Sequence, residues 1–236
     1  MRKYLLALFV IILTSGAAFG SGYGEINVKL GLDLISALDS NEKNAQGVDS
    51  EFVSASYKTG FSISGEYLCP VLNTLKLGAG IEYLFPRKAD GNWKNYAIGI
   101  PEEYSGMPVY IVLQINPIED GFFIKGSLGY VVFFDRGDTN WSMRTEPDGA
   151  GNSYEAYMEV LDKKGGVYYG LAMGHEFGFG LIIEASIDCY NGSSEYRYGS
   201  NSYNYDTMVS QNDFGKYTKD TSFYKAGIKV GYKVKL

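Results

Sequence analysis

The sequence ends in the segment SFYKAGIKVGYKVKL, residues 222–236, and this segment decides the fold. Every second residue is apolar or aromatic: Tyr224, Ala226, Ile228, Val230, Tyr232, Val234 and Leu236. The residues between them are mostly lysine and glycine. This alternation is typical of a β-strand with one apolar and one polar face. The segment is longer than the about 9–11 residues that a tilted strand needs to cross a bilayer, so it predicts a membrane-spanning strand.

The chain begins with the three parts of a secretory signal. Arg2 and Lys3 precede an apolar run at residues 5–13, and a small-residue stretch ends at Ala18-Phe19-Gly20. The run is shorter than the about 20 apolar residues of a transmembrane helix. We therefore predict a signal peptide over residues 1–20, removed on export, and one β-barrel domain over residues 21–236.

Alternating segments recur through the rest of the chain. They lie at residues 25–34, 61–67, 75–85, 109–116, 122–134, 167–176, 181–188 and 222–236. Long polar insertions at 36–51, 86–106, 135–165 and 190–220 take turns with short connections at 69–74, 116–121 and near 178. An even strand number with short turns at one end and long loops at the other is typical of outer-membrane barrels. The pattern predicts an all-β fold, an eight-stranded antiparallel up-and-down transmembrane β-barrel, with both termini periplasmic and four extracellular loops.

Side-chain volume decides which face of these strands points outward. The apolar faces supply about forty mostly large side chains, whereas an eight-stranded barrel has an interior just wide enough to be filled by side chains. The apolar set therefore has to face lipid, and closed barrels are one of the two structures that satisfy all backbone groups there. The partner of the exterior is then the lipid bilayer with its lipopolysaccharide.

The polar faces place charged residues of both signs inside the barrel. The predicted interior charge network consists of Lys29, Glu66, Glu82, Lys125, Glu176, Glu184, Lys225 and Lys229. Buried charges require partners, so this set predicts ion pairs and hydrogen bonds that form a polar plug. The alternative is a gated path for ions, although open aqueous channels are a property of barrels with 16–18 strands.

The end of the chain also resembles the carboxy-terminal assembly signal of bacterial outer-membrane barrels. The signal places a polar residue, a glycine and two apolar residues at the positions of Lys229, Gly231, Val234 and Leu236. With this signal, the whole mature chain resembles the small eight-stranded bacterial outer-membrane protein β-barrel family, exemplified by OmpX and the membrane domain of OmpA. The resemblance implies the outer-membrane assembly machinery as a partner. The chain departs from the family in ending in Leu236 where Phe is usual, and no periplasmic domain follows the barrel, so peptidoglycan binding is not implied.

The net charge and the two cysteines limit the kinds of partner and the disulfide bonds that can be expected. The formal net charge is −6, and removal of Arg2 and Lys3 makes it −8, which argues against nucleic acid and gives no reason to expect an anionic surface as partner. Cys69 and Cys189 fall at opposite ends of the predicted barrel, out of disulfide range. The sequence therefore predicts two thiols and no disulfide.

Little in the sequence indicates catalysis. Some barrels of this kind modify lipid A and use a histidine with a serine or an aspartate near the outer leaflet. The one histidine, His175, falls at the periplasmic end of its strand, so an interfacial role is the better interpretation. No Cys/His cluster has metal-binding spacing and no glycine loop is placed to hold a phosphate. We expect neither an enzyme nor a bound metal or cofactor.

The long insertions are the candidates for binding at the cell surface. The third contains Arg136-Gly137-Asp138, which resembles the integrin-binding tripeptide, and acidic residues in the same insertion are a weak candidate for calcium. The fourth contains tyrosines among Ser, Asn and Gly, including Tyr196, Tyr198, Tyr203 and Tyr205. Such a mixture is favoured in binding surfaces, or else the tyrosines stabilise strands that continue above the membrane. The predicted function is a non-enzymatic outer-membrane protein with a structural or adhesive role in contact with host or other surface ligands; the alternative is a narrow channel.

Overall fold

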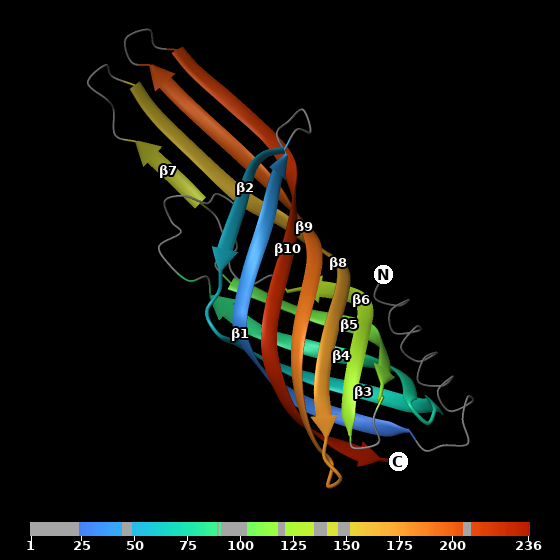
Figure 1. Ribbon diagram of the computed structural model, residues 1–236. Coiled ribbons are helices and arrows are strands. Elements are labelled where there is room, and N and C mark those ends of the chain that lie inside the picture. Colours follow the sequence, from blue (N-terminus) through green and yellow to red (C-terminus); the bar gives the residue numbers. More distant parts are fainter. Residues whose placement is uncertain are drawn as a thin grey trace.

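The computed structural model describes residues 24–43, 49–88, 90, 103–117, 121–134, 141–145, 152–204 and 209–236. Ten strands run through these residues (Figure 1). They are β1 (Glu25–Lys43), β2 (Asp49–Ser56), β3 (Gly60–Leu72), β4 (Leu75–Lys88), β5 (Glu103–Ile115), β6 (Phe122–Phe133), β7 (Trp141–Thr145), β8 (Asn152–Glu176), β9 (Leu181–Asn204) and β10 (Val209–Lys235). No helix in these ranges is long and apolar enough to cross a membrane.

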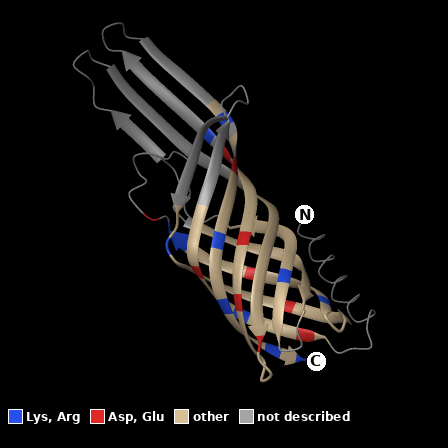
Figure 2. Cartoon of the chain, viewed as in Figure 1, with Lys and Arg blue, Asp and Glu red and all other residues tan. Residues whose placement is uncertain are grey.

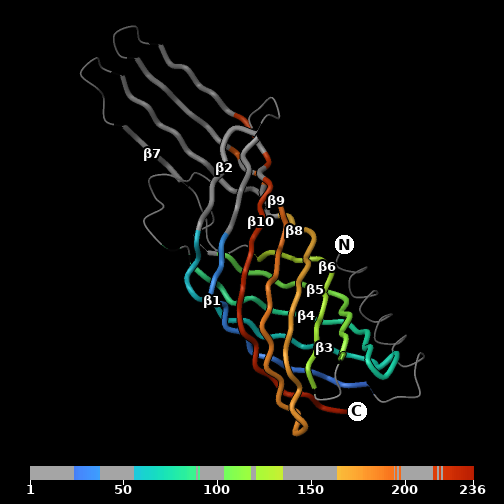
Figure 3. The backbone as a smooth tube through the Cα atoms, in the orientation of Figure 1, coloured from blue at the N-terminus to red at the C-terminus, as the bar shows by residue number. Residues whose placement is uncertain are grey.

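Eight of the strands form a closed antiparallel barrel. Their order is β10-β9-β8-β6-β5-β4-β3-β1, and β1 pairs with β10 to complete the ring, as the blue and red segments of Figure 3 show. The other two strands add no position to the ring. β2 pairs with the part of β1 that extends beyond β3, and β7 pairs with the part of β8 that extends beyond β6. The predicted eight-stranded up-and-down barrel is confirmed.

The two faces of the sheet are assigned as the volume argument requires. Large apolar side chains on the outside are exposed, for example Leu30 (65%), Leu171 (70%) and Ile187 (67%). The charged side chains that alternate with them are buried, and Figure 2 shows them as red and blue bands along the barrel strands. An exterior of this kind is stable only against hydrocarbon, so the barrel spans a membrane. In β1 a bulge between Asp33 and Ile35 shifts the alternation by one residue.

The connections at one end of the barrel are tight. We call this the terminal end, because Glu25 and Lys235 pair there, and the other end the projecting end. Residues 73–74 form the turn between β3 and β4. Between β8 and β9, Gly180 has a φ of 99°, a backbone conformation that favours glycine. Its carbonyl oxygen accepts a hydrogen bond from the backbone N–H of Lys233.

At the projecting end the strands continue far beyond the barrel, which corrects the prediction of long loops. Residues 36–43, 152–165, 190–204 and 209–220 are strand rather than loop. β9 has 24 residues and β10 has 27, about twice what a transmembrane strand needs, and their pairing is continuous from Leu181↔Tyr232 to Asn204↔Val209 (Figure 1). The extension of strands above the membrane, one of the two interpretations of the tyrosine-rich insertion, is therefore correct for the backbone. Tyrosine favours this conformation because it fits a pleated sheet.

The two cysteines lie on different strands. Cys69 is in β3 near the terminal turn, and Cys189 is buried in β9 toward the projecting end. They are not joined by a disulfide in the described part of the chain, as the sequence predicts. The Cys189 thiol lies 3.6 Å from the Asn191 side-chain oxygen.

Candidate functional site

The middle of the barrel lumen holds a cluster of two lysines and two glutamates. Lys29 Nζ lies 2.6 Å from Glu66 and 2.9 Å from Glu184, and Lys125 Nζ lies 2.8 Å from Glu66 and 2.6 Å from Glu184. The Tyr110 hydroxyl donates to Glu66 at 3.2 Å. Each ammonium group thus contacts both carboxylates. We call these four charged residues the central cluster; it joins β1, β3, β6 and β9 across the lumen.

A second cluster lies nearer the projecting end. Lys225 and Lys229 both contact Glu82, at 2.6 Å and 2.9 Å, and lie 3.6 Å and 3.8 Å from Asp188. The Tyr168 hydroxyl donates to Asp188 at 2.8 Å. Asp33 and Arg87 complete this upper cluster: Arg87 pairs with Asp33, which also lies 3.4 Å from Lys225.

A third, half-buried cluster occupies the mouth at the terminal end. Lys76 lies 2.7 Å from Glu25 and 3.1 Å from Glu176, and Lys233 lies 2.6 Å from Glu176. The Gln114 amide donates to Glu176 at 2.7 Å. Glu176 is therefore the centre of this terminal cluster and holds β4, β5 and β10 to the end of β8.

An aromatic layer covers the upper cluster on the projecting side. The Tyr104 and Phe223 rings stack at 3.9 Å, and Tyr57 meets Phe223 edge-on at 5.6 Å. Tyr190 stacks on Tyr168 at 5.1 Å and lies 5.9 Å from Phe223. These five side chains are at most 6% exposed. Their rings pack against one another at the level of Arg87, whose guanidinium carbon lies 5.5 Å from the centre of the Phe223 ring. An ion that passed these rings would lose part of its hydration.

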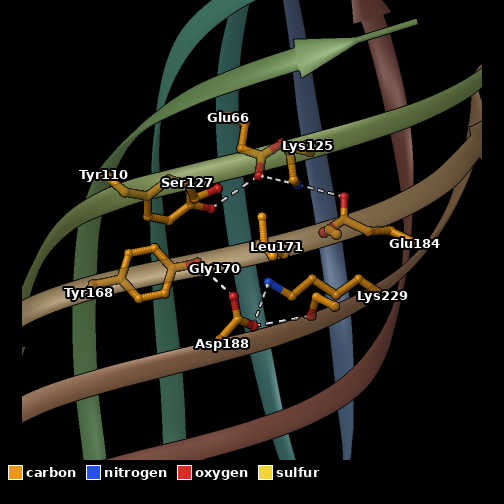
Figure 4. Close-up of a pocket in the computed structure, with 12 residues that line it drawn as sticks. Glu66, Tyr110, Lys125, Ser127, Tyr168, Gly170, Leu171, Glu184, Asp188 and Lys229 are labelled. Carbon is orange, nitrogen blue, oxygen red and sulfur yellow. Dashed lines mark hydrogen bonds and ion pairs between the residues drawn. The ribbon is translucent and has the colours of Figure 1, made fainter. Parts of the chain in front are cut away.

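The three clusters are neutral, each on its own. The bases are Lys29 and Lys125 in the central cluster, Arg87, Lys225 and Lys229 in the upper one, and Lys76 and Lys233 in the terminal one. The acids of the central cluster are Glu66 and Glu184. Those of the upper cluster are Asp33, Glu82 and Asp188, and those of the terminal cluster are Glu25 and Glu176. A hollow between the central and upper clusters is lined by side chains of both, among them Glu66, Lys125, Asp188 and Lys229 (Figure 4). The described charges of the lumen are thus paired with one another across it.

All eight residues predicted for the interior charge network lie in these clusters. Seven belong to the central and upper clusters, and Glu176 belongs to the terminal one. The prediction left out six charged residues: Glu25, Asp33, Lys76, Arg87, Asp188 and Lys233. The alternation of the strands places five of them on the polar, inward face, although the predicted network does not include them: Glu25, Asp33, Lys76, Asp188 and Lys233. Arg87 was beyond reach, because the β4–β5 register shifts between Leu84 and Arg87.

The predicted surface-binding residues fall mainly outside what the structure describes. Arg136, Gly137, Asp138 and Tyr205 lie outside the described residues. For Tyr196, Tyr198 and Tyr203 only the backbone is described, and it belongs to β9, where Tyr196 pairs with Tyr217 of β10. Their part in ligand binding stays a prediction.

The residues of the predicted assembly signal all lie in or next to the strand that closes the barrel. Lys229 and Gly231 are on the lumen face of β10, Val234 is exposed on the outside, and the Leu236 backbone N–H donates to the Gly24 carbonyl at 2.9 Å. Recognition of these residues by an assembly machinery stays a prediction.

His175 lies at the terminal end of β8, paired with Phe122 and Ile183. Its ring contacts Phe177 edge-on, with 4.5 Å between centroids. Among the described residues, no group of three or more His, Cys, Asp and Glu side chains is placed to hold a metal ion. The surroundings of His175 are those of an aromatic side chain at the membrane boundary.

No family model and no curated protein sequence matches the chain. Among solved structures it is similar to the outer membrane protein OprG from Pseudomonas aeruginosa, with 16% identity and a TM-score of 0.48 over 91% of this chain and 98% of that one. It is also similar to Ail, the attachment invasion locus protein of Yersinia pestis, with 12% identity and a TM-score of 0.40 over 90% of this chain and 99% of that one. A third similar structure is that of the outer membrane protein AlkL, with 14% identity and a TM-score of 0.44 over 92% of this chain and 93% of that one. The chain's own closed sheet and apolar exterior are those of an outer-membrane β-barrel.

Proposed function

We propose that this protein is a closed, non-enzymatic barrel of the outer membrane that acts at the cell surface through the strands of its projecting end. The observation that carries the proposal is the combination of a lumen filled by neutral charge clusters with strands about twice the transmembrane length. A filled lumen leaves the exterior and the projecting sheet as the parts that meet other molecules. A structural role in the envelope or adhesion to a host or other surface follows from this division.

The orientation proposed here puts both termini in the periplasm and the projecting end outside. Short turns on the periplasmic side and long extensions outside are the rule for outer-membrane barrels. The Arg136-Gly137-Asp138 tripeptide and the tyrosines of residues 190–205 are then on the outer side. The predicted signal peptide over residues 1–20 supplies the export that this location requires.

Planar-bilayer recordings test the closed lumen. We expect purified protein to give no steady unit currents, because every described charged side chain in the lumen has an ion partner and the aromatic layer covers them. Steady unit currents of one size would favour the alternative function, a narrow channel for ions or small solutes.

Protease treatment of intact cells tests the orientation. We expect cleavage within residues 135–165 or 190–220 and protection of the barrel, which is seen as a band whose gel mobility changes on boiling. Cells opened to admit protease to the periplasm are the control. Cleavage only in opened cells would contradict the proposed orientation.

Cells that display a variant with residues 194–218 replaced by a short turn test the surface role. We expect them to retain the folded barrel and to lose adhesion to surfaces coated with fibronectin or collagen. Equal adhesion of both strains, and of cells without the protein, would contradict an adhesive function on these ligands and leave the envelope role.

A further inference from the structure

The seam where β1 meets β10 has a regular pattern on its lumen face. Three cross-strand pairs follow each other: Lys29↔Gly231, Gly31↔Lys229 and Asp33↔Gly227. Each pair joins one charged residue to one glycine, and the glycine alternates between the two strands. The charged members are all buried.

The glycines are needed because the charged side chains cross over them. Lys29 starts on β1 and reaches Glu184 on β9, so it passes over β10 at Gly231. A methyl group on Gly231 would overlap Lys29 Cγ and the carbonyl oxygen of Val28. The backbone atom cannot move aside, so any side chain at this position conflicts with the native pairing.

The other two pairs work in the same way. A methyl group on Gly31 would overlap Ser62 Oγ and lie 3.3 Å from Lys229 Cγ. One on Gly227 would lie 2.5 Å from the Leu32 carbonyl oxygen and 3.2 Å from Asp33 Oδ1. Lys229 extends past Gly31 toward Glu82 on β4, and Asp33 extends toward Arg87 and Lys225. The glycines thus leave the space through which the central and upper clusters form.

Other registers of the same two strands lose this match. A slip of one residue turns every lumen side chain toward the lipid, so only even slips compete. A slip of two residues in one direction places Lys29 opposite Lys229, and in the other direction opposite Lys233. In both, Gly31 faces another glycine. Each slipped seam therefore places two lysines side by side, which is destabilising. The same slips bring Asp33 opposite Lys225 or Lys229, but Asp33 already lies 3.4 Å from Lys225 in the native register.

We propose that the alternation of charged residues and glycines along this seam selects the register in which the barrel closes. Lys229 and Gly231, two residues of the predicted assembly signal, then act in closure through Gly31 and Lys29 of β1. This role is independent of recognition by an assembly machinery and of the protein's function at the surface.

Reversal of one pair tests the proposal. Gly31→Lys places two lysines opposite each other, whereas Gly31→Lys with Lys229→Gly restores one lysine and one glycine. This pair is chosen because the atoms close to Gly31 belong to side chains and not to the backbone. The full mature chain is folded into phospholipid vesicles without assembly proteins, and the folded fraction is read from gel mobility before and after boiling. We expect Gly31→Lys to lower the folded yield at least about tenfold, as for an uncompensated buried charge, and the reversed pair to recover it.

Disulfide trapping reads the register directly. In a Cys69→Ser/Cys189→Ser background, Leu30→Cys with Val230→Cys joins the native pair on the outer face, and Leu30→Cys with Ile228→Cys or Tyr232→Cys joins the two slipped pairs. We expect only the native bond with the wild-type seam and slipped bonds, or none, with Gly31→Lys. Gly231→Ala should lower the native bond, whereas Gly65→Ala, where no atom lies within 4 Å, should not.

Three results would overturn the proposal. Wild-type yield and native bonding of Gly31→Lys would show that the turns alone fix the register. Failure of the reversed pair to recover would show that the pairing of charge with glycine is not what matters. A defect of the seam variants in cells that is absent in vesicles would assign Lys229 and Gly231 to recognition by the assembly machinery.

Discussion

Replacing Glu82 with alanine is expected to lower the free energy of unfolding by about 3–5 kcal/mol, the range for removing one partner of a buried ion pair. Glu82 is completely buried and is the nearest anion to both Lys225 (2.6 Å) and Lys229 (2.9 Å). Its loss leaves the upper cluster with three cations and two anions. The desolvation of a buried ammonium group without a close counterion is the source of the cost.

The matched control for Glu82→Ala is Glu195→Ala. Glu195 also lies between two lysines, Lys164 at 3.9 Å and Lys216 at 3.6 Å, but its side chain is 29% exposed and theirs are 58% exposed. An exposed pair of this kind contributes about 0–1 kcal/mol. Urea titration of both variants in vesicles, followed by tyrosine and tryptophan fluorescence, measures the difference. Equal small effects would mean that water enters the lumen and solvates the clusters, which would also weaken the case for a plug.

Much of the barrel was predictable because lipid imposes a strict alternation on every strand that crosses it. The faces of residues 222–236 and 181–188 are read correctly from the sequence, and the volume argument turns the apolar face outward. The alternation does not reveal the bulge after Asp33 or the register shift beyond Leu84. Each irregularity moves the following residues to the opposite face of the sheet, and no particular residue type marks the position where this happens. Arg87 was missed for that reason.

The sequence pattern predicts loops where the structure has the projecting strands, because the alternation of apolar and polar residues that marks a membrane strand is absent there. Residues 190–220 contain Ser, Asn, Gly and Tyr with both faces polar, yet β9 and β10 keep an unbroken ladder through them. Such a ribbon needs only cross-strand pairing, not an apolar face. The aromatic layer escaped prediction for the opposite reason. Tyr190 and Phe223 stand on the lumen face, where charge and glycine were expected, and only the structure shows that they meet above the upper cluster.

The outward face is tested by an arginine in the middle of it. Leu128 is 55% exposed on β6, between Ile111 and Tyr169 of the neighbouring strands, and about half-way along the strand. Leu128→Arg is expected to cost about 2–4 kcal/mol, because a cation on the lipid face at mid-bilayer loses its hydration. Unfolding in vesicles measures this cost.

Leu72→Arg makes the same change at a site of similar exposure, 63%, next to the turn at the terminal end. Near the membrane boundary the cost of an arginine falls to about 0–1 kcal/mol, since the side chain reaches water. Both variants lose a leucine, so the difference between their free energies of unfolding measures the effect of depth in the bilayer. If both arginines were tolerated equally, the apolar exterior would not lie in hydrocarbon. The barrel would then need another apolar partner, because about thirty large hydrophobic side chains are exposed on its described surface.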